Sequence, residues 1–205
     1  MTTITKNMII HRIHDSYNAI SSLPYASYEN CSSVFNEYMD FLIRSLCNWK
    51  AVQFKGYGKL VPRFKKGGRP VRNPKTGEAL VMQDTYTVRL GSKANNSDGE
   101  LERIVTSKQK SHVAFIVGVV RKADTINAEV MGDIVVNEFI SALNESANTD
   151  HRIELRGFGV FSSKQVEQTF SRNPKTGEKV LTPARRQNHF KVSKTLRKRL
   201  KEARR

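Results

Sequence analysis

The sequence predicts an α+β protein made of two tandem copies of one unit, each with a helical pair followed by a β-hairpin and a two-stranded ribbon. Three observations support this fold class. The seven residues Arg72–Glu78 recur letter for letter, 100 positions later, as Arg172–Glu178. Before each copy, apolar and polar residues alternate around a Gly-aromatic-Gly turn, which is typical of hairpins. Further upstream, apolar residues recur at three- and four-residue spacing, which is typical of half-buried helices.

The repeated heptad has the composition of a ribbon tip. Asn-Pro opens a turn, the proline ring fixes φ, and the glycine three residues later accepts a positive φ. In both copies Arg and Lys flank this rigid, apolar proline. Cations that follow phosphates and a proline that wedges between base steps are the chemistry of a finger that enters a minor groove.

Two helices are expected before the first arm. Ile10, Ile13, Tyr17 and Ile20 have the spacing of one buried stripe, and Leu23-Pro24 is expected to end that helix. A second helix is expected over residues 27–46. Its expected core residues are Val34, Phe35, Tyr38, Phe41, Leu42 and Leu46. His11 and His14 lack a clear third ligand, so no metal is expected.

The first hairpin and arm are expected over residues 51–90. Tyr86, Val88 and Leu90 alternate with polar residues as a returning strand should. The stretch 91–99 that follows is dense in Gly, Asn and Ser, and therefore indicates a linker rather than a helix.

The second unit restarts near Ser107. The run Val113–Val120 suits a helix, although it could also form a strand. The next helix is expected to have Thr125 as its cap. Its expected core stripe is Met131, Ile134, Val135, Phe139, Ala142 and Leu143. The second hairpin and arm are expected over residues 152–188, followed by a helix with Val192, Leu196, Leu200 and Ala203 on one face.

Charge points to a polyanionic partner. The net charge is +16, with 14 basic and 8 acidic residues in 1–100 and 21 basic and 11 acidic residues in 101–205. Residues 185–205 contain ten Lys or Arg and one acid, so a phosphate-facing helix is favoured there over a merely solvated one. The two cysteines, about 24 Å apart in one expected helix, cannot bridge each other there, which favours a reducing compartment. No signal-peptide or membrane-spanning pattern is found, and no catalytic constellation stands out.

Several motifs resemble the HU/integration host factor family of DNA-bending proteins. They match in order and spacing, and they are Gly157-Phe158-Gly159, Arg172-Asn173-Pro174, Pro183-Ala184, Phe190-Lys191, Lys194 and Leu196. The second repeat matches over nearly its whole length, and the first from about residue 4 to residue 78. The resemblance implies repeats with an N-terminal helical pair and a three-stranded sheet with a protruding β-ribbon arm, paired as an intrachain pseudo-dimer. The implied domains are residues 1–92 (repeat one, its third helix lost), 93–106 (linker) and 107–205 (repeat two, with a basic C-terminal helix).

The resemblance implies an architectural protein that contacts phosphates and bends double-stranded DNA with little sequence specificity. No cofactor, catalytic residue, metal or membrane partner is expected, and the location would be the cytoplasm or nucleoid of a bacterial cell. The expected DNA contacts are Lys55, Arg69, Arg72, Asn73, Pro74, Lys75, Arg156, Arg172, Asn173, Pro174, Lys175, Arg185, Arg186, Lys191 and Lys194.

A second hypothesis is a structural assembly protein that reuses the fold, such as a ring or connector component of a phage virion. Its arms would grip protein neighbours, and the alternating strand 86–90 could add to a partner's sheet. Both hypotheses stay open at this point.

Overall fold

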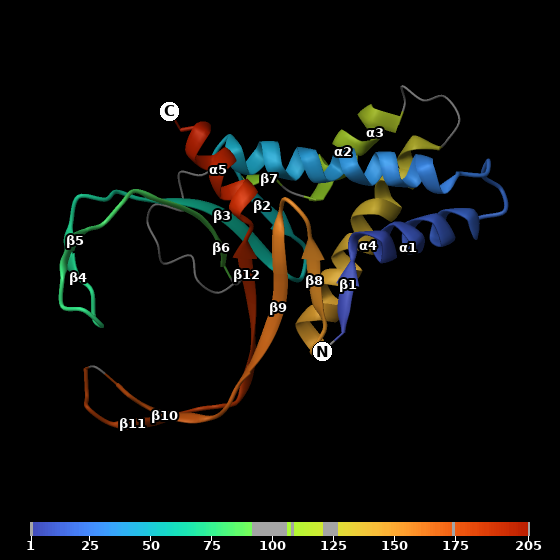
Figure 1. The fold of residues 1–205 in the computed structure, drawn as a ribbon. Helices are drawn as coiled ribbons and strands as arrows, with labels where there is room; N and C mark the ends of the chain where they lie inside the picture. The colour runs from blue at the N-terminus through green and yellow to red at the C-terminus, as the bar shows by residue number, and fades with distance from the viewer. Residues whose placement is uncertain (1, 92–105, 108, 121–126, 174, 205) are drawn as a thin grey trace.

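The computed structural model describes residues 2–91, 106–107, 109–120, 127–173 and 175–204, and it confirms the expected tandem α+β architecture. A helical body packs against two curved sheets, from which two ribbon arms project to the same side (Figure 1). The first repeat contains β1 (Thr3–Thr5), α1 (Lys6–Asn18), α2 (Tyr28–Cys47), β2 (Ala51–Phe54), β3 (Gly58–Lys65), β4 (Pro70–Arg72), β5 (Ala79–Val81) and β6 (Thr85–Gly91). The second contains β7 (Thr106–Ser107), α3 (Gln109–Val120), α4 (Ala128–Asn148), β8 (Arg152–Leu155), β9 (Gly159–Val166), β10 (Thr169–Arg172), β11 (Lys179–Thr182), β12 (Arg185–Val192) and α5 (Lys194–Glu202).

Helix α1 is shorter than predicted. It ends at Asn18, so the expected end at Leu23-Pro24 is wrong. The Asn18 side chain explains the early end: its amide donates to the Ala26 carbonyl and its oxygen accepts from the Ala26 N–H, both at 2.9 Å. Ile20 therefore lies beyond the helix and is 38% exposed. The residues that α1 does bury are Ile9, Ile10, Ile13 and Tyr17.

Side-chain caps fix the starts of the two long helices. Ser27 accepts from the Asn30 N–H at 3.2 Å, which starts α2 one residue after the predicted boundary. Asn127 accepts from the Val130 N–H at 3.2 Å, so the prediction of Thr125 as the cap of α4 is wrong. Asn and Ser both satisfy an N–H group that the first turn of a helix leaves without a partner.

The run Val113–Val120 forms a helix rather than a strand. Ile116 and Val120, one turn apart on α3, are both 1% exposed. Helix α3 packs closely on α4 because Gly132 has no side chain, and a Cβ there would lie 3.3 Å from the carbonyl oxygen of Val113.

The two repeats exchange a short strand with each other. One sheet has the order β1-β8-β9-β12 and the other has the order β6-β3-β2-β7. Strand β1 of the first repeat pairs in parallel with β8, placing Ile4 beside Ile153, and β7 of the second repeat pairs in parallel with β2, placing Thr106 beside Ala51. The resemblance implied three strands for each repeat. The fourth strand of each sheet comes from the other repeat.

One hydrophobic core is shared by both repeats. It joins α1, α2 and β2 of the first to α3, α4 and β9 of the second. At its centre, Phe54 packs edge-on against Phe139 and Phe161, with ring centroids 5.5 and 6.5 Å apart. Because neither repeat encloses these rings alone, the chain folds as an intrachain pseudo-dimer.

The C-terminal helix is confirmed with narrower limits. Ser193 caps α5 by accepting from the Leu196 N–H at 3.0 Å, so Val192 belongs to β12 and the exposed Ala203 follows the helix. Leu196 and Leu200 are fully buried. Of the predicted linker 93–106 only Thr106 lies among the described residues, and the expected loss of a third helix after Gly91 falls outside them. None of the described helices has the length and apolar character needed to cross a membrane.

Candidate nucleic-acid interface

The tip of the first arm is a loop fixed by its own hydrogen bonds. The Asn73 N–H donates to the Glu78 carbonyl at 2.9 Å, and the Gly77 N–H donates to the Asn73 carbonyl at 2.8 Å. The Asn73 side chain also accepts from the Lys75 N–H at 3.0 Å, which encloses Pro74 in a tight turn. Gly77 has a φ of +73°, a conformation that glycine adopts without a steric cost. The exposed proline is thus presented on a rigid loop.

The described residues of the second arm repeat the backbone and Asn hydrogen bonds of this loop. Asn173 makes the same two backbone bonds, at 2.9 and 2.8 Å, and accepts from the Lys175 N–H at 3.0 Å. Gly177 has a φ of +75°. Pro174, the predicted second wedge, lies outside the described residues. Identical heptads therefore produce the same hydrogen-bonded turn among their described residues.

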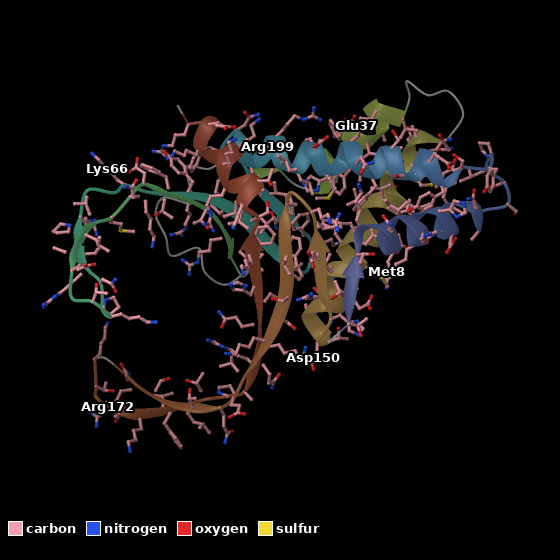
Figure 2. All side chains as sticks on the ribbon, viewed as in Figure 1. Met8, Glu37, Lys66, Asp150, Arg172 and Arg199 are labelled. Atoms are coloured by element: carbon pink, nitrogen blue, oxygen red, sulfur yellow. The ribbon has the colours of Figure 1, made fainter. Side chains whose placement is uncertain are left out.

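The shafts of the arms present apolar and cationic side chains together. In the second arm Phe170 pairs with Leu181, and two residues further on Arg172 pairs with Lys179. Residues two apart on a strand share a face, so a 73%-exposed phenyl ring lies on the same face as two cations. Figure 2 shows Arg172 near the end of this arm. Such a face can contact both phosphates and the apolar wall of a groove.

The first arm differs at its root by one extra residue. Lys65 and Arg72 are seven positions apart, whereas the matching Val166 and Arg172 are six apart. Gly67 and Gly68 accommodate the extra residue in a turn. The Gly67 N–H donates to the Asp84 carboxylate at 2.7 Å, and the Gly68 N–H donates to the Met82 carbonyl at 2.8 Å. A Cβ on Gly67 would lie 2.3 Å from the Met82 oxygen. The two arms therefore leave the body differently, although their tips match.

The remaining predicted contacts lie on the body and on the shafts. Lys55 and Arg156 are exposed in the equivalent turns β2–β3 and β8–β9. Lys191 is exposed at the end of β12, and Lys194 at the start of α5. Exposed Arg69 and Arg185 lie at the roots of opposite arms.

Arg186 has structural partners as well. Its guanidinium donates to the Thr149 carbonyl at 2.6 Å, to the Ser163 hydroxyl at 3.1 Å and to the Asp150 carboxylate at 2.8 Å. These bonds tie β12 to the end of α4. A phosphate contact by Arg186 stays a prediction.

The predicted site did not include four cations of α5, and three of these, Arg197, Lys198 and Lys201, lie together in the structure. With Lys194 they line a cleft of about 350 Å³ against Asp84, Thr85 and Tyr86 of the first repeat. These four cations are three, one and three residues apart, which places them on one helical face. This spacing is visible in the sequence and could have identified them as one group. The partner surface was not predictable, because it belongs to the other repeat.

The arrangement is suited to binding a polyanion. The exposed cations occur on both arms, on both hairpin turns and on α5, and the two arms enclose an open space on one side of the body (Figures 1 and 2). Within the described part of the chain, no group of three His, Cys, Asp or Glu side chains could hold a metal ion.

The chain has sequence similarity to known proteins. A family model described as "Bacterial DNA-binding protein" matches residues 4–95 and 115–201. Integration host factor subunit beta of Ralstonia nicotianae is 46% identical over 68 residues, which are 33% of this chain and 49% of that protein. The same subunit of Bordetella parapertussis is 43% identical over 68 residues and 57% of its length. The chain thus spans about half the length of these curated relatives. A cocrystal structure of Anabaena HU with DNA matches with a TM-score of 0.36 and 26% identity, over 46% of this chain and 97% of that one.

Proposed function

Because this chain belongs to the bacterial DNA-binding protein family over both of its repeats, we propose that it is an architectural protein that binds and bends double-stranded DNA. It acts as one chain with two arms, without a catalytic step, and it works on the nucleoid of a bacterial cell. Recognition depends on the shape and deformability of the duplex rather than on base edges.

The observation that carries this proposal is that the two tip turns share the same hydrogen bonds. Both arms leave the same side of one body (Figure 1), and both loops are rigid before any ligand arrives. Rigid loops lose little conformational entropy on binding. Two wedges held by one body can therefore act on one duplex at two places.

Each part of the interface has a separate physical role in the proposal. The arm cations Arg69, Arg72, Lys75, Arg172 and Lys175 contact phosphates, which supplies most of the affinity. Pro74 and Pro174 insert at base steps, where unstacking costs a few kcal/mol each and allows the duplex to bend toward the body. The body cations Lys55, Arg156 and Lys191 then bind the bent duplex.

A proline substitution at each tip tests the proposal. The double variant Pro74→Ala/Pro174→Ala keeps every cation, so its affinity for straight duplex should change little. It should lose the preference for nicked duplex and produce a smaller bend, measured by energy transfer between end-labelled DNA. Pro70→Ala is the matched control, because Pro70 is an exposed proline in the shaft of the first arm rather than at its tip.

An unchanged bend in the double variant would show that Pro74 and Pro174 do not act as wedges. If wild-type protein did not bind DNA at all, the proposed function would be rejected, and the arms would be assigned to a protein partner instead. Replacement of Leu80 and Val81, which are 50% and 68% exposed on the first arm, by Asp should then prevent assembly with protein neighbours.

A further inference from the structure

The second arm continues the register of its sheet without a break. Val166 pairs with Arg185 at the end of the sheet, and Thr169 pairs with Thr182 at the start of the ribbon. Each strand therefore crosses the root of this arm in three steps. The alternation of side chains between the two faces continues from the body into the arm.

The first arm breaks its register at the same place. Lys65 pairs with Thr85 in the sheet, and Pro70 pairs with Val81 in the ribbon, so the outgoing strand takes five steps through the root and the returning strand takes four. One extra residue on one strand of an antiparallel pair is a β-bulge, which bends the strand and increases its twist. In Figure 1 the first arm turns away from the line of β3 and β6 near Lys66, which Figure 2 labels.

The bulge keeps the end of the first arm on the same face as that of the second. Paired residues share a face, and Ala79, the partner of Arg72, is six residues before Thr85 on the returning strand, which has no extra residue. Arg72 therefore lies on the face of Thr85, as Arg172 lies on the face of Arg185 in the second arm. Without a bulge, the extra residue would turn Arg72 and the tip that follows it to the opposite face.

Three hydrogen bonds among the described residues hold this bulge. Two are backbone bonds: the Gly68 N–H donates to the Met82 carbonyl at 2.8 Å, and the Met82 N–H donates to the Arg69 carbonyl at 2.9 Å. The third involves the side chain of Asp84, whose carboxylate accepts from the Gly67 N–H at 2.7 Å. Gly68 has a φ of +85°, and a Cβ on Gly67 would lie 2.3 Å from the Met82 oxygen, so glycine is required at both positions.

Asp84 acts on the arm alone. Its side chain is exposed and lies outside the hydrophobic core, so it contributes nothing to the packing of the body. Its bond to Gly67 joins the returning strand to the bulge 17 positions earlier in the chain. The matching position of the second arm is Ala184, which has no side-chain acceptor, and the root of that arm has no bulge to hold.

We infer that Asp84 is a positioning residue of the first arm, and that its hydrogen bond to Gly67 fixes the bulge that aims Pro74 at the duplex. The inference rests on the proposed function and makes the two arms unequal. The second arm is aimed by a continuous ribbon, whereas the aim of the first depends on one exposed carboxylate.

Three substitutions in the full chain test the inference by energy transfer between the labelled ends of a saturated duplex. Asp84→Ala removes the acceptor and should lower the transfer by as much as Pro74→Ala does. Asp84→Asn keeps an oxygen that can accept from the Gly67 N–H, and should keep the wild-type transfer. Glu167→Ala is the matched control, because it removes one exposed acid from the root of the second arm, and it should also keep the wild-type transfer.

Combinations with the tip prolines show through which arm Asp84 acts. Two changes that act through the same wedge should not add, whereas changes that act through different wedges should. Asp84→Ala/Pro74→Ala should therefore lose no more of the bend than either single variant. Asp84→Ala/Pro174→Ala should lose as much as Pro74→Ala/Pro174→Ala. The melting temperature of Asp84→Ala should match that of wild type, which distinguishes a misdirected arm from a damaged body.

A wild-type bend in Asp84→Ala, a lowered melting temperature in that variant, or an equal loss of bend in Glu167→Ala would overturn the role of Asp84. An equal loss in Asp84→Asn would overturn it too, because the charge rather than the hydrogen bond would then be responsible. Additive losses with Pro74→Ala would overturn the assignment to the first arm. In each of these cases the wild-type chain still bends the duplex and the proposed function stands. A wild-type chain that did not bend the duplex would reject both.

Discussion

At the residue scale, Glu145 of α4 joins side chains from both repeats. Its carboxylate accepts from the Arg12 guanidinium of α1 at 2.7 Å and lies 3.1 Å from Nδ1 of His151. The hydrogen bond from Arg12 lowers the pKa of Glu145 below its ordinary value of 4.5, burial opposes this, and His151 lowers it further. The charged carboxylate therefore stabilises the contact between the repeats.

This network predicts a particular dependence of stability on pH. Since the folded state lowers the pKa of Glu145, the stabilisation is present above pH 4.5 and is lost as the pH falls through the folded value. Glu145→Gln should lower the free energy of unfolding at pH 7 by about 1 kcal/mol, and the difference from wild type should shrink below pH 4.5. Urea unfolding at several pH values measures this.

Glu154→Gln is the control, because Glu154 is about half exposed and its nearest cation, Arg152, is 3.8 Å away. A wild-type advantage over Glu145→Gln that stayed constant from pH 7 to pH 3 would show that the network does not act through this charge.

The turn conformation of the two tips was predictable from sequence, whereas the end of α1 and the cap of α4 were not. An exact heptad with Asn-Pro and a later Gly allows few conformations, and both loops have the expected turn. The end of α1 depends on Asn18 reaching Ala26, eight residues away, which no local pattern reveals. The cap at Asn127 rather than Thr125 is a choice between two suitable residues that lie close in sequence.

At the element scale, the packed helices α3 and α4 each contain a glycine, and the two glycines have opposite requirements. Gly118 of α3 has no heavy atom within 4 Å of an added Cβ. A Cβ on Gly132 of α4 would lie 3.3 Å from atoms of both Val113 and Val117. The first glycine is a cost to helix stability, and the second allows close packing.

Two substitutions should therefore change thermal stability in opposite directions. Gly118→Ala should stabilise the protein by about 0.5–1 kcal/mol, because alanine has the higher helix propensity. Gly132→Val should destabilise it by about 1–3 kcal/mol through overpacking. Thermal unfolding followed by circular dichroism compares the two variants. Equal and small effects would mean that α3 is not held against α4 at Gly132.

Periodicity predicted most element types, but it did not predict which strands β1 and β7 pair with. The spacing in α2 and α4 predicted both helices well. The run that became α3 was ambiguous until its contacts with α2 and α4 were known. Strands β1 and β7, of three and two residues, are too short to show alternation, and β1 pairs with residues about 149 positions away. Their exchange between the repeats could not be predicted from sequence.

At the scale of the whole molecule, one chain supplies both halves of a body that neither repeat can complete alone. The shared aromatic core and the exchanged strands join the halves in space. Joining them in one chain makes the pairing an intramolecular step with a high effective concentration. It also allows the halves to differ, as the two arm roots do.

The central claim is that a single chain of 23.3 kDa bends one duplex with its two arms. Energy transfer between dyes on the two ends of a duplex, titrated with protein well above the dissociation constant, tests it most directly. The account predicts that transfer rises and reaches its plateau at one chain for each duplex. Unchanged transfer while the duplex is bound, or a plateau at two chains for each duplex, would contradict it.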